Sequence, residues 1–271
     1  MTLQRVYCVT HEAPLVPDHL ADYVIGVGDY RPPPARGAHV SVLDAFWDRM
    51  RPYSYGAAGN YVIPRAIDAT GSTDLTGIFS HRKIIVRTKI GEPSTALDFY
   101  HEVSIDEAKR IPRHEIEPRP GFEFLIGFPL KFDCGVVEHY IDSHWAIDLF
   151  EYVSMAVEMG ILTLDEAQGF AQERYFIPGG CELGVYPTIW VRPMLEALES
   201  LGRRFVSRNA ARIETYNSFQ VRAVGFLAER LGSFLLLSEL RRRFPAGIPQ
   251  HLCGYLCAIV PPGGSYREAT V

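Results

Sequence analysis

TDLTGIFSHRKIIVRTKI, residues 73–90, is the stretch that decides the fold class. It contains two runs rich in apolar and β-branched residues, 73–80 and 83–90, and such runs predict strands. His81 and Arg82 stand between the two runs, and Lys83 begins the second. Other runs of this kind recur along the chain and alternate with segments of helical pattern. This alternation predicts an α/β protein built around a sheet.

The remaining expected elements extend this pattern along the chain. Two capping boxes, Ser104 with Glu107 and Thr163 with Glu166, predict the beginnings of two helices. Further strands are expected at 4–10, 22–28, 122–128 and 185–191, and further helices at 41–50, 60–69, 138–160, 193–205 and 216–243. Helices dominate late in the chain, so we predict one α/β domain over residues 1–250 with a helix-rich C-terminal part. Residues 251–271 are expected to form a partly loose C-terminal extension.

Composition limits the classes of function. The chain has 271 residues, of which 47% are hydrophobic, and its net charge is −5. This acidic balance argues against a nucleic-acid partner, because such proteins carry a basic excess. No run approaches the roughly 18 to 20 apolar residues of a transmembrane segment, and the first residues lack the apolar run of a signal peptide. The five scattered cysteines contain no CxxC pair, which predicts free thiols in the cytoplasm.

Basic residues cluster at two places, Arg203–Arg204 and Arg241–Arg243. We interpret each cluster as a solvated helix end. The alternative is an anionic partner, either a nucleotide phosphate or a membrane surface, because both attract clustered positive charge. The sequence therefore leaves a peripheral membrane contact open.

Several common catalytic motifs are missing from the sequence. It contains neither the GxGxxG nicotinamide fingerprint nor the GxxxxGK[ST] phosphate-binding loop. It also lacks the HExxH zinc motif and the GxSxG nucleophile elbow. The Asp-x-Asp pair with which many sugar-nucleotide enzymes hold a divalent metal is absent as well. The His, Asp, Glu and Arg residues at expected element ends are typical of binding and acid–base chemistry.

The segment EHYIDSHWAIDLF, residues 138–150, carries a row of polar residues. In a helix, Tyr140, His144 and Asp148 lie on one face because they are four residues apart. His139 lies about 140° around the helix from His144, so these residues do not converge on one metal ion. The row is interpreted either as part of a site or as a buried network of polar groups.

Four segments resemble one bacterial family. They are VTH (9–11), GIFSHRK (77–83), EHYIDSHWAIDL (138–149) and RAVGFLAERL (222–231). In this order they are similar to motifs of the glycosyltransferase-like family of capsular and O-antigen polysaccharide loci, long catalogued as a domain of unknown function. Ser80, His81 and His139 depart from the family pattern. The segment at residues 60–64 also lacks a glutamate that members usually carry.

The resemblance covers most of the chain and implies both a fold and an activity. The implied fold is GT-A-like, a Rossmann-type α/β/α sandwich. The implied activity is transfer of a hexosyl group from a nucleotide-sugar, with a UDP-sugar favoured as donor, to a hydroxyl of a glycan or small-molecule acceptor. The missing Asp-x-Asp pair means that a divalent metal is not indicated.

On this basis, five residues are candidates for donor binding. Thr10 and His11 end the first expected strand, where ligands of open α/β sheets bind, and are assigned to the nucleoside. Arg82 suits bidentate phosphate contact, with His81 and Lys83 as further candidates beside it. Strand alternation would point His81 and Lys83 to one side and Arg82 to the other. The structural alternative is that these charges only keep an edge strand soluble.

The acceptor side is assigned to the row in the segment 138–150. Asp148 is the candidate base for the acceptor hydroxyl, acting directly or through His144, and Tyr140 and Glu138 are candidates for acceptor binding.

The last matched motif contributes three further candidates. Arg222 and Glu229 are expected either to form a buried ion pair or, for Arg222, to contact the donor phosphate. Arg230 belongs to the same structural or phosphate-binding group.

Two other functions remain open. A non-catalytic nucleotide-sugar or glycan binding protein is the first, motivated by the missing Asp-x-Asp pair and the missing glutamate at 60–64. A metal-dependent hydrolase is the second, and it would require bound zinc.

Overall fold

The computed structural model describes residues 3–266, and its sheet is organised around the first expected strand, β1 (Gln4–Thr10). β1 pairs in parallel with β2 (Tyr23–Gly26) on one side and with β4 (Leu75–Ser80) on the other. Its side chains alternate, so that Tyr7 and Val9 enter one hydrophobic cluster while Val6 and Cys8 enter another. The sheet therefore has a buried core on each face.

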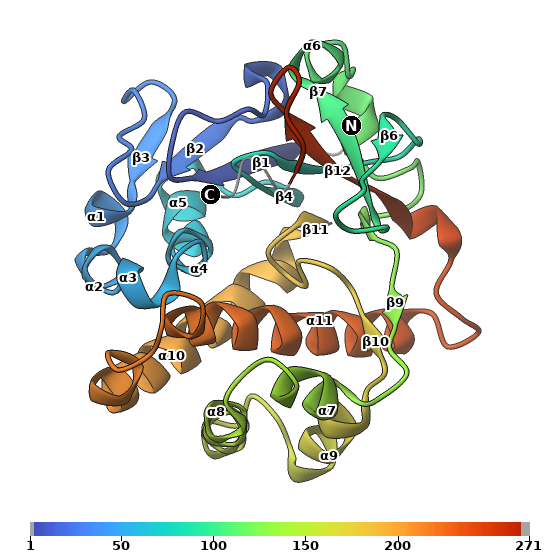
Figure 1. Cartoon of the computed structure of the whole chain (residues 1–271). Coiled ribbons are helices and arrows are strands. Elements are labelled where there is room, and N and C mark those ends of the chain that lie inside the picture. Colours follow the sequence, from blue (N-terminus) through green and yellow to red (C-terminus); the bar gives the residue numbers. More distant parts are fainter. Residues whose placement is uncertain (1–2, 267–271) are drawn as a thin grey trace.

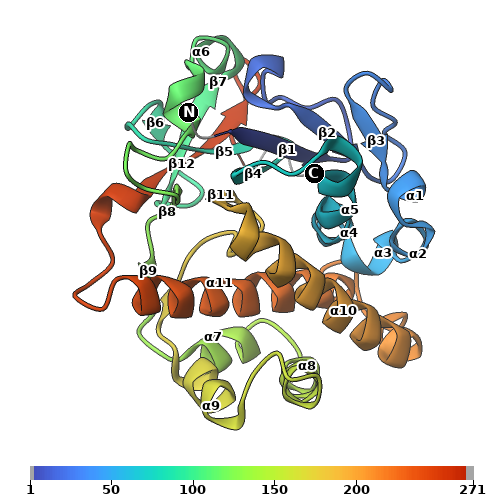
Figure 2. The same ribbon diagram turned by 180° about the vertical axis from the view of Figure 1, so that it is seen from behind.

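The main path of the sheet has the order β3-β2-β1-β4-β5-β12-β7-β6 (Figures 1 and 2). From β3 to β4 all pairs are parallel, whereas β12 is antiparallel to β5 and parallel to β7. β11 pairs with β4 and β8 pairs with β12, while β9 and β10 form a separate two-stranded sheet. The remaining strands are β3 (Gly37–His39), β5 (Lys83–Val86), β6 (Glu92–Pro93), β7 (Tyr100–Ser104), β8 (Ile126–Gly127), β9 (Leu130–Lys131), β10 (Tyr175–Phe176), β11 (Gly184–Pro187) and β12 (Cys253–Val260).

Helices cover both faces of the sheet. α4, α5 and α10 pack on one face, and α6 with the short 3-10 helices η1 and η2 packs on the other, which gives the expected α/β/α sandwich. α11 lies between the sheet and the group α7, α8 and α9, as both views show (Figures 1 and 2). The helices are α1 (Val40–Leu43), α2 (Ala45–Arg49), α3 (Arg51–Ser54), α4 (Ala57–Tyr61), α5 (Ile63–Thr70), α6 (Ile105–Ala108), α7 (Val136–Ile141), α8 (Ala146–Glu158), α9 (Leu164–Gln172), α10 (Thr188–Ile213) and α11 (Ala223–Arg243), with 3-10 turns η1 (Asp18–Leu20), η2 (Arg113–Ile116), η3 (Gln220–Arg222) and η4 (Gln250–Leu252).

The end of the described chain differs from the expected loose extension. Residues 253–260 form β12, a buried strand between β5 and β7. Its run of apolar and small residues, CGYLCAIV, fills an interior position that needs apolar side chains on both faces. The domain therefore extends beyond residue 250. The last part of the expected extension, residues 267–271, lies outside the described residues.

The expected helix over residues 138–160 is interrupted. α7 ends at Ile141 and α8 begins at Ala146, with a turn between them. The break lies at Trp145, whose backbone is extended with ψ of 117°. The Ser143 carbonyl beside it accepts a hydrogen bond from Gln220 Nε2 at 2.6 Å, so the turn is satisfied by a residue far away in the chain. The row at Tyr140, His144 and Asp148 is therefore not one helical face.

Other expected elements are confirmed or shortened. Both capping boxes form, Ser104 with Glu107 at α6 and Thr163 with Glu166 at α9. The strand expected at 122–128 is reduced to β8. The strand expected at 185–191 ends at Pro187, where α10 begins. The helix expected at 41–50 is divided into α1 and α2 because Asp44 leaves the helical conformation and caps α2.

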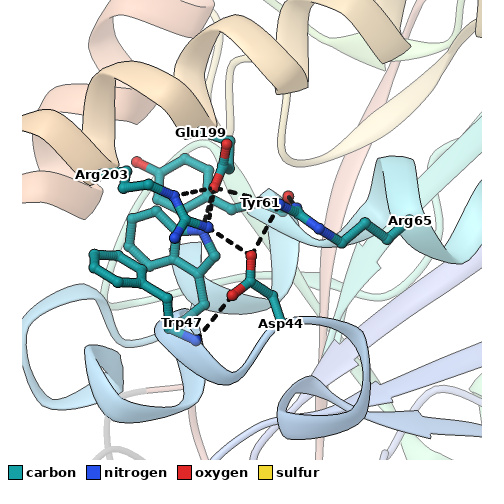
Figure 3. A network of polar contacts seen from close by, with 7 residues as sticks. Asp44, Trp47, Tyr61, Arg65, Glu199 and Arg203 are labelled. Carbon is teal, nitrogen blue, oxygen red and sulfur yellow. Dashed lines mark hydrogen bonds and ion pairs between the residues drawn. The ribbon is translucent and has the colours of Figure 1, made fainter.

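A polar network ties α2, α5 and α10 together (Figure 3). The Glu199 carboxylate accepts hydrogen bonds from Trp47 Nε1 at 2.8 Å and from Arg203 Nη2 at 2.6 Å. Asp44 forms ion pairs with the same Arg203 and with Arg65. Because Glu199 and Trp47 are buried, these contacts replace the water that the polar groups would otherwise need.

Within residues 3–266, none of the helices combines the length and apolar character needed to cross a membrane. All five cysteines have free thiols, and four of them are buried.

Candidate functional site

The candidate site is a cavity of about 470 Å³ at the carboxyl ends of β1 and β4. Thr10, the last residue of β1, and Ser80, the last residue of β4, both line it. The chain continues from β1 to β2 on one side of this point, while β4 lies on the other side. Such a switch in strand order leaves a crevice between neighbouring strand ends, where open α/β sheets bind ligands.

Charged and aromatic side chains from distant parts of the chain converge on the cavity. The lining includes the cations Arg51, Arg82, Lys83 and Arg222, the carboxyl groups Glu182 and Glu229, the imidazoles His11 and His81, and the tyrosines Tyr55, Tyr100 and Tyr266. Seven sequence candidates line the cavity: Thr10, His11, His81, Arg82, Lys83, Arg222 and Glu229. The structure brings the donor-side candidates to one place.

His81 and Arg82 form the turn between β4 and β5. The expectation that Arg82 points away from His81 and Lys83 is therefore wrong, because strand alternation does not continue through a hairpin turn. Arg82 Nη2 donates to the Tyr266 carbonyl at 3.0 Å, and the guanidinium lies 4.8 Å from the centre of the Tyr266 ring. Arg82 Nη1 is buried and has no hydrogen-bond partner among residues 3–266.

Arg51 and Arg222 present similar unsatisfied groups. Their guanidinium carbons lie 5.2 Å and 5.4 Å from the centre of the Tyr55 ring. The Nε atom of each is buried without a hydrogen-bond partner in the described part of the chain. The expected buried ion pair between Arg222 and Glu229 is not among the ion pairs of the described residues. Because buried charged donors are normally paired, these arginines indicate an anion site.

The carboxyl end of β1 carries a small polar cluster. Thr10 Oγ1 lies 3.2 Å from His81 Nδ1, and His81 Nε2 lies 3.1 Å from a Glu12 carboxylate oxygen. The His11 and His81 rings have centres 5.2 Å apart. Burial lowers the pKa of His81 to about 4, although Glu12 acts in the opposite direction. His81 is therefore a neutral hydrogen-bonding group near pH 7, not a cation.

Sequence reasoning missed Glu182, which belongs to the loop between β10 and β11. Burial and the neighbouring Glu229 carboxylate raise the pKa of Glu182 to about 8, with Asn60 and Lys83 acting in the opposite direction. Glu229 itself accepts a hydrogen bond from the Gly179 backbone N–H at 2.9 Å. The signal available in the sequence was one acid inside the glycine-rich turn PGGCELG, at residues 178–184.

The acceptor-side candidates do not line this cavity. Glu138 is exposed on α7, while Tyr140 and His144 are buried, with ring centres 4.6 Å apart. Asp148 has 0% exposure and forms an ion pair with Arg212 at 2.7 Å. Burial raises the pKa of Asp148, while Arg212 opposes the shift. Asp148 lies outside the cavity lining and is held by Arg212, so the geometry favours the alternative of a buried polar network.

The same network reaches the wall of the cavity. His144 packs against Phe219 and Phe226, with ring centres 5.2 Å and 4.4 Å away. Arg222 lies over both of these phenyl rings from the cavity side of the contact. Arg230 packs on Tyr140, with its guanidinium carbon 5.0 Å from the ring centre, and does not reach the cavity. These residues support the position of Arg222.

Replacing Asp148 by asparagine tests this structural role. We expect the variant to lose about 1–3 kcal/mol of unfolding free energy, because the Arg212 guanidinium loses the charge of its buried carboxylate partner and keeps only a neutral acceptor. Ligand binding in the cavity should stay within about threefold of the wild-type value, since Asp148 is not part of its lining. Chemical denaturation and calorimetric titration measure the two quantities. A stable variant that no longer binds ligand would contradict the assignment.

Comparisons with known proteins establish the fold. No protein-family model and no curated protein matches the sequence. Among solved structures, the chain is similar to the apo structure of the bifunctional glycosyltransferase WbbM, with a TM-score of 0.72 at 11% sequence identity. The similarity covers 94% of this chain and 45% of the WbbM chain, so this chain spans less than half of that protein. The expected GT-A-like, Rossmann-type α/β fold is thereby confirmed.

Proposed function

We propose that the protein is a glycosyltransferase that binds a nucleotide-sugar donor in the cavity at the ends of β1 and β4. The observation that carries this proposal is the group of arginines without ion-pair partners among residues 3–266, at a strand-order switch of a glycosyltransferase-like fold. Arg51, Arg82 and Arg222 each bring a buried N–H without a partner. A diphosphate provides the negative charge and the acceptor oxygens that these groups lack.

The proposed chemistry is transfer of a hexosyl group to a hydroxyl of a glycan or small molecule. Arg82 and the neighbouring Lys83 neutralise the charge that develops on the leaving diphosphate, the task that a divalent metal performs in many such enzymes. Thr10 and His11 lie beside this cluster at the end of β1, where they contact the nucleoside. A UDP-sugar is the favoured donor, and transfer is expected to continue when EDTA is present.

The biological setting is also part of the proposal. We infer polysaccharide biosynthesis of the capsule or O-antigen type in the cytoplasm, and five unpaired thiols suit that reducing compartment. A peripheral membrane contact remains a prediction. The acceptor-side roles of Glu138, Tyr140, His144 and Asp148 are not carried into this proposal, because these side chains lie outside the cavity lining.

A thermal-shift screen with UDP-, GDP-, dTDP- and CMP-sugars tests donor binding. A true donor at about 100 times its Kd stabilises the folded state by about 2.7 kcal/mol, which raises Tm by roughly 5 °C or more. The free sugars serve as controls, because they lack the diphosphate and should leave Tm unchanged. If every nucleotide-sugar leaves Tm unchanged, the cavity does not bind a donor and the proposal is wrong.

A second assay separates an enzyme from a binding protein. Nucleotide release from the stabilising donor is measured with and without a mixture of glycan acceptors, and again with EDTA. The proposal requires release that depends on acceptor. A donor that raises Tm but is never turned over, even at high protein concentration, would identify a non-catalytic nucleotide-sugar binding protein.

A further inference from the structure

We propose that Glu182 is the catalytic base that removes the proton from the attacking acceptor hydroxyl. This inference rests on the proposed glycosyltransferase function and names the group that performs its proton transfer. Glu182 and Glu229 are the carboxyl groups that line the cavity. Glu229 accepts a hydrogen bond from the backbone N–H of Gly179. Glu182 Oε1, in contrast, is buried and has no hydrogen-bond partner within residues 3–266. Glu182 therefore retains an oxygen for a substrate proton.

The loop that carries Glu182 is fixed at several points. Gly179 and Gly180 have φ values of +82° and +51°, a conformation that favours glycine. A Cβ atom at Gly180 would lie 2.6 Å from the Glu229 carbonyl oxygen, so the loop packs directly on α11. The Tyr186 hydroxyl lies 2.7 Å from the carbonyl oxygens of both Gly180 and Leu183. Residues on both sides of Glu182 are thus held in place, which orients its side chain.

The surroundings of Glu182 suit a base that works near neutral pH. Burial and Glu229 raise its pKa to about 8, so its ionised form is a stronger base than an ordinary carboxylate. Asn60, from the segment that lacks the glutamate expected from the family resemblance, lies within hydrogen-bonding reach of Glu182. The carboxyl group proposed as the base therefore stands on the loop before β11, next to an amide on α4.

The proton transfer completes a simple displacement. The acceptor oxygen forms a bond to the anomeric carbon of the donor sugar, and the bond from that carbon to the diphosphate oxygen breaks. The electron pair of the broken bond leaves with the diphosphate, whose charge the cavity cations neutralise. The hydroxyl proton moves to the ionised Glu182 carboxylate, which afterwards releases it to water. No oxidant, reductant or further reactant is needed.

The test compares Glu182→Gln with the wild-type protein, using the donor found by thermal shift and an accepted glycan. We expect kcat to fall by about 10²-fold or more, because general-base catalysis contributes about 10²–10⁴-fold. The donor-induced rise in Tm should remain, since the amide preserves the shape of the cavity. Glu123→Gln is the matched control, because Glu123 is an exposed carboxylate paired with Arg243 outside the cavity. This control should retain full turnover.

The pH dependence gives a second measurement. The wild-type kcat/KM should rise with pH, with a midpoint near 8 in the free protein, and this rise should be absent from the residual activity of Glu182→Gln. Glu182→Asp should recover part of kcat, since it restores a carboxylate. Transfer by Glu182→Gln within threefold of wild type would overturn the assignment of Glu182 alone. A wild-type protein that binds no donor would overturn the proposed function as well.

The pH dependence of stability tests whether folding raises the pKa of Glu182. The pKa of Glu182 is raised from 4.5 to about 8 in the folded protein, so the folded state keeps a proton that the unfolded chain releases between these pH values. The wild-type protein therefore loses the stability that this proton contributes as pH rises through this window. The glutamine variant lacks this contribution at every pH. We expect the Tm of Glu182→Gln relative to wild type to be higher at pH 8 than at pH 4.5. A constant difference in Tm would contradict the buried, proton-binding environment that the proposal requires.

Discussion

Replacing Arg82 by methionine should weaken donor binding by about 100-fold or more. Arg82 is 6% exposed, and its Nη1 atom is buried in the cavity region without a partner among the described residues. A donor phosphate would pair with this charge away from water, where removing one partner of a charge pair typically costs about 2–5 kcal/mol. Methionine keeps much of the side-chain volume, so the loss reports on charge and hydrogen bonding. Isothermal titration with the identified donor measures it.

Two comparisons make the Arg82 result specific. Arg82→Lys retains the charge but not the bidentate geometry, so we expect an intermediate loss of affinity. Arg204→Met removes a surface arginine that pairs with Glu158 outside the cavity, and its donor affinity should match the wild type. The unliganded Arg82→Met protein should have a stability close to that of the wild type, because removing a buried charge without an ion-pair partner among the described residues offsets the lost contacts with Tyr266. An unchanged Kd for Arg82→Met would rule out its proposed contact with the diphosphate.

Replacing Glu199 by alanine should have the largest effect on stability. Glu199 is 8% exposed, and its carboxylate accepts hydrogen bonds from Trp47 and Arg203. The alanine variant leaves the buried indole N–H without this partner and removes one carboxylate from two arginines. Breaking a buried ion pair on one side costs about 3–5 kcal/mol. We therefore expect Tm to fall by roughly 10 °C, measured by calorimetry.

The control for Glu199 lies one turn earlier on the same helix. Glu196 pairs with Arg192 at the surface in an i, i+4 arrangement. The Glu196 side chain is 50% exposed and the Arg192 side chain is 36% exposed. Glu196→Ala should change the unfolding free energy by less than about 1 kcal/mol, because surface ion pairs contribute little. Equal losses for the two variants would mean that the network in Figure 3 adds nothing beyond ordinary helix effects. Trp47 also packs on Tyr61 of α4, with ring centres 4.4 Å apart, so the network steadies the helix that carries Asn60.

The features that sequence predicts well depend on local patterns. β1 and β4 follow from short apolar runs, and the two capping boxes follow from residues three positions apart. The strand-end rule then places Thr10 and His11 at the carboxyl edge of the sheet, while Arg82 is selected by the family resemblance. The strand-end part of this reasoning needs only neighbouring residues and strand direction, and the residues that it selects do line the cavity.

The features that sequence missed depend on partners far away in the chain. The turn after Ile141 has its Ser143 carbonyl hydrogen-bonded to Gln220, a partner that no local sequence pattern reveals. Glu182 gains its raised pKa from burial and from Glu229, which joins it only in the folded chain. The position of Asp148 beside Arg212 likewise depends on how α8 packs on α10. For this reason the residues predicted to bind the acceptor do not line the cavity, whereas the residues predicted to bind the donor do.

The position of β12 has a consequence for how the chain folds. β12 is the last strand of the described chain, but it pairs with both β5 and β7 and therefore connects two parts of the sheet. Tyr255 pairs with Val86, so this contact closes a very long loop, and such contacts slow folding. During synthesis the edges of β5 and β7 stay unpaired until the ribosome has made the chain through Val260. Newly made protein thus passes through a stage with open sheet edges, when protection from aggregation matters most.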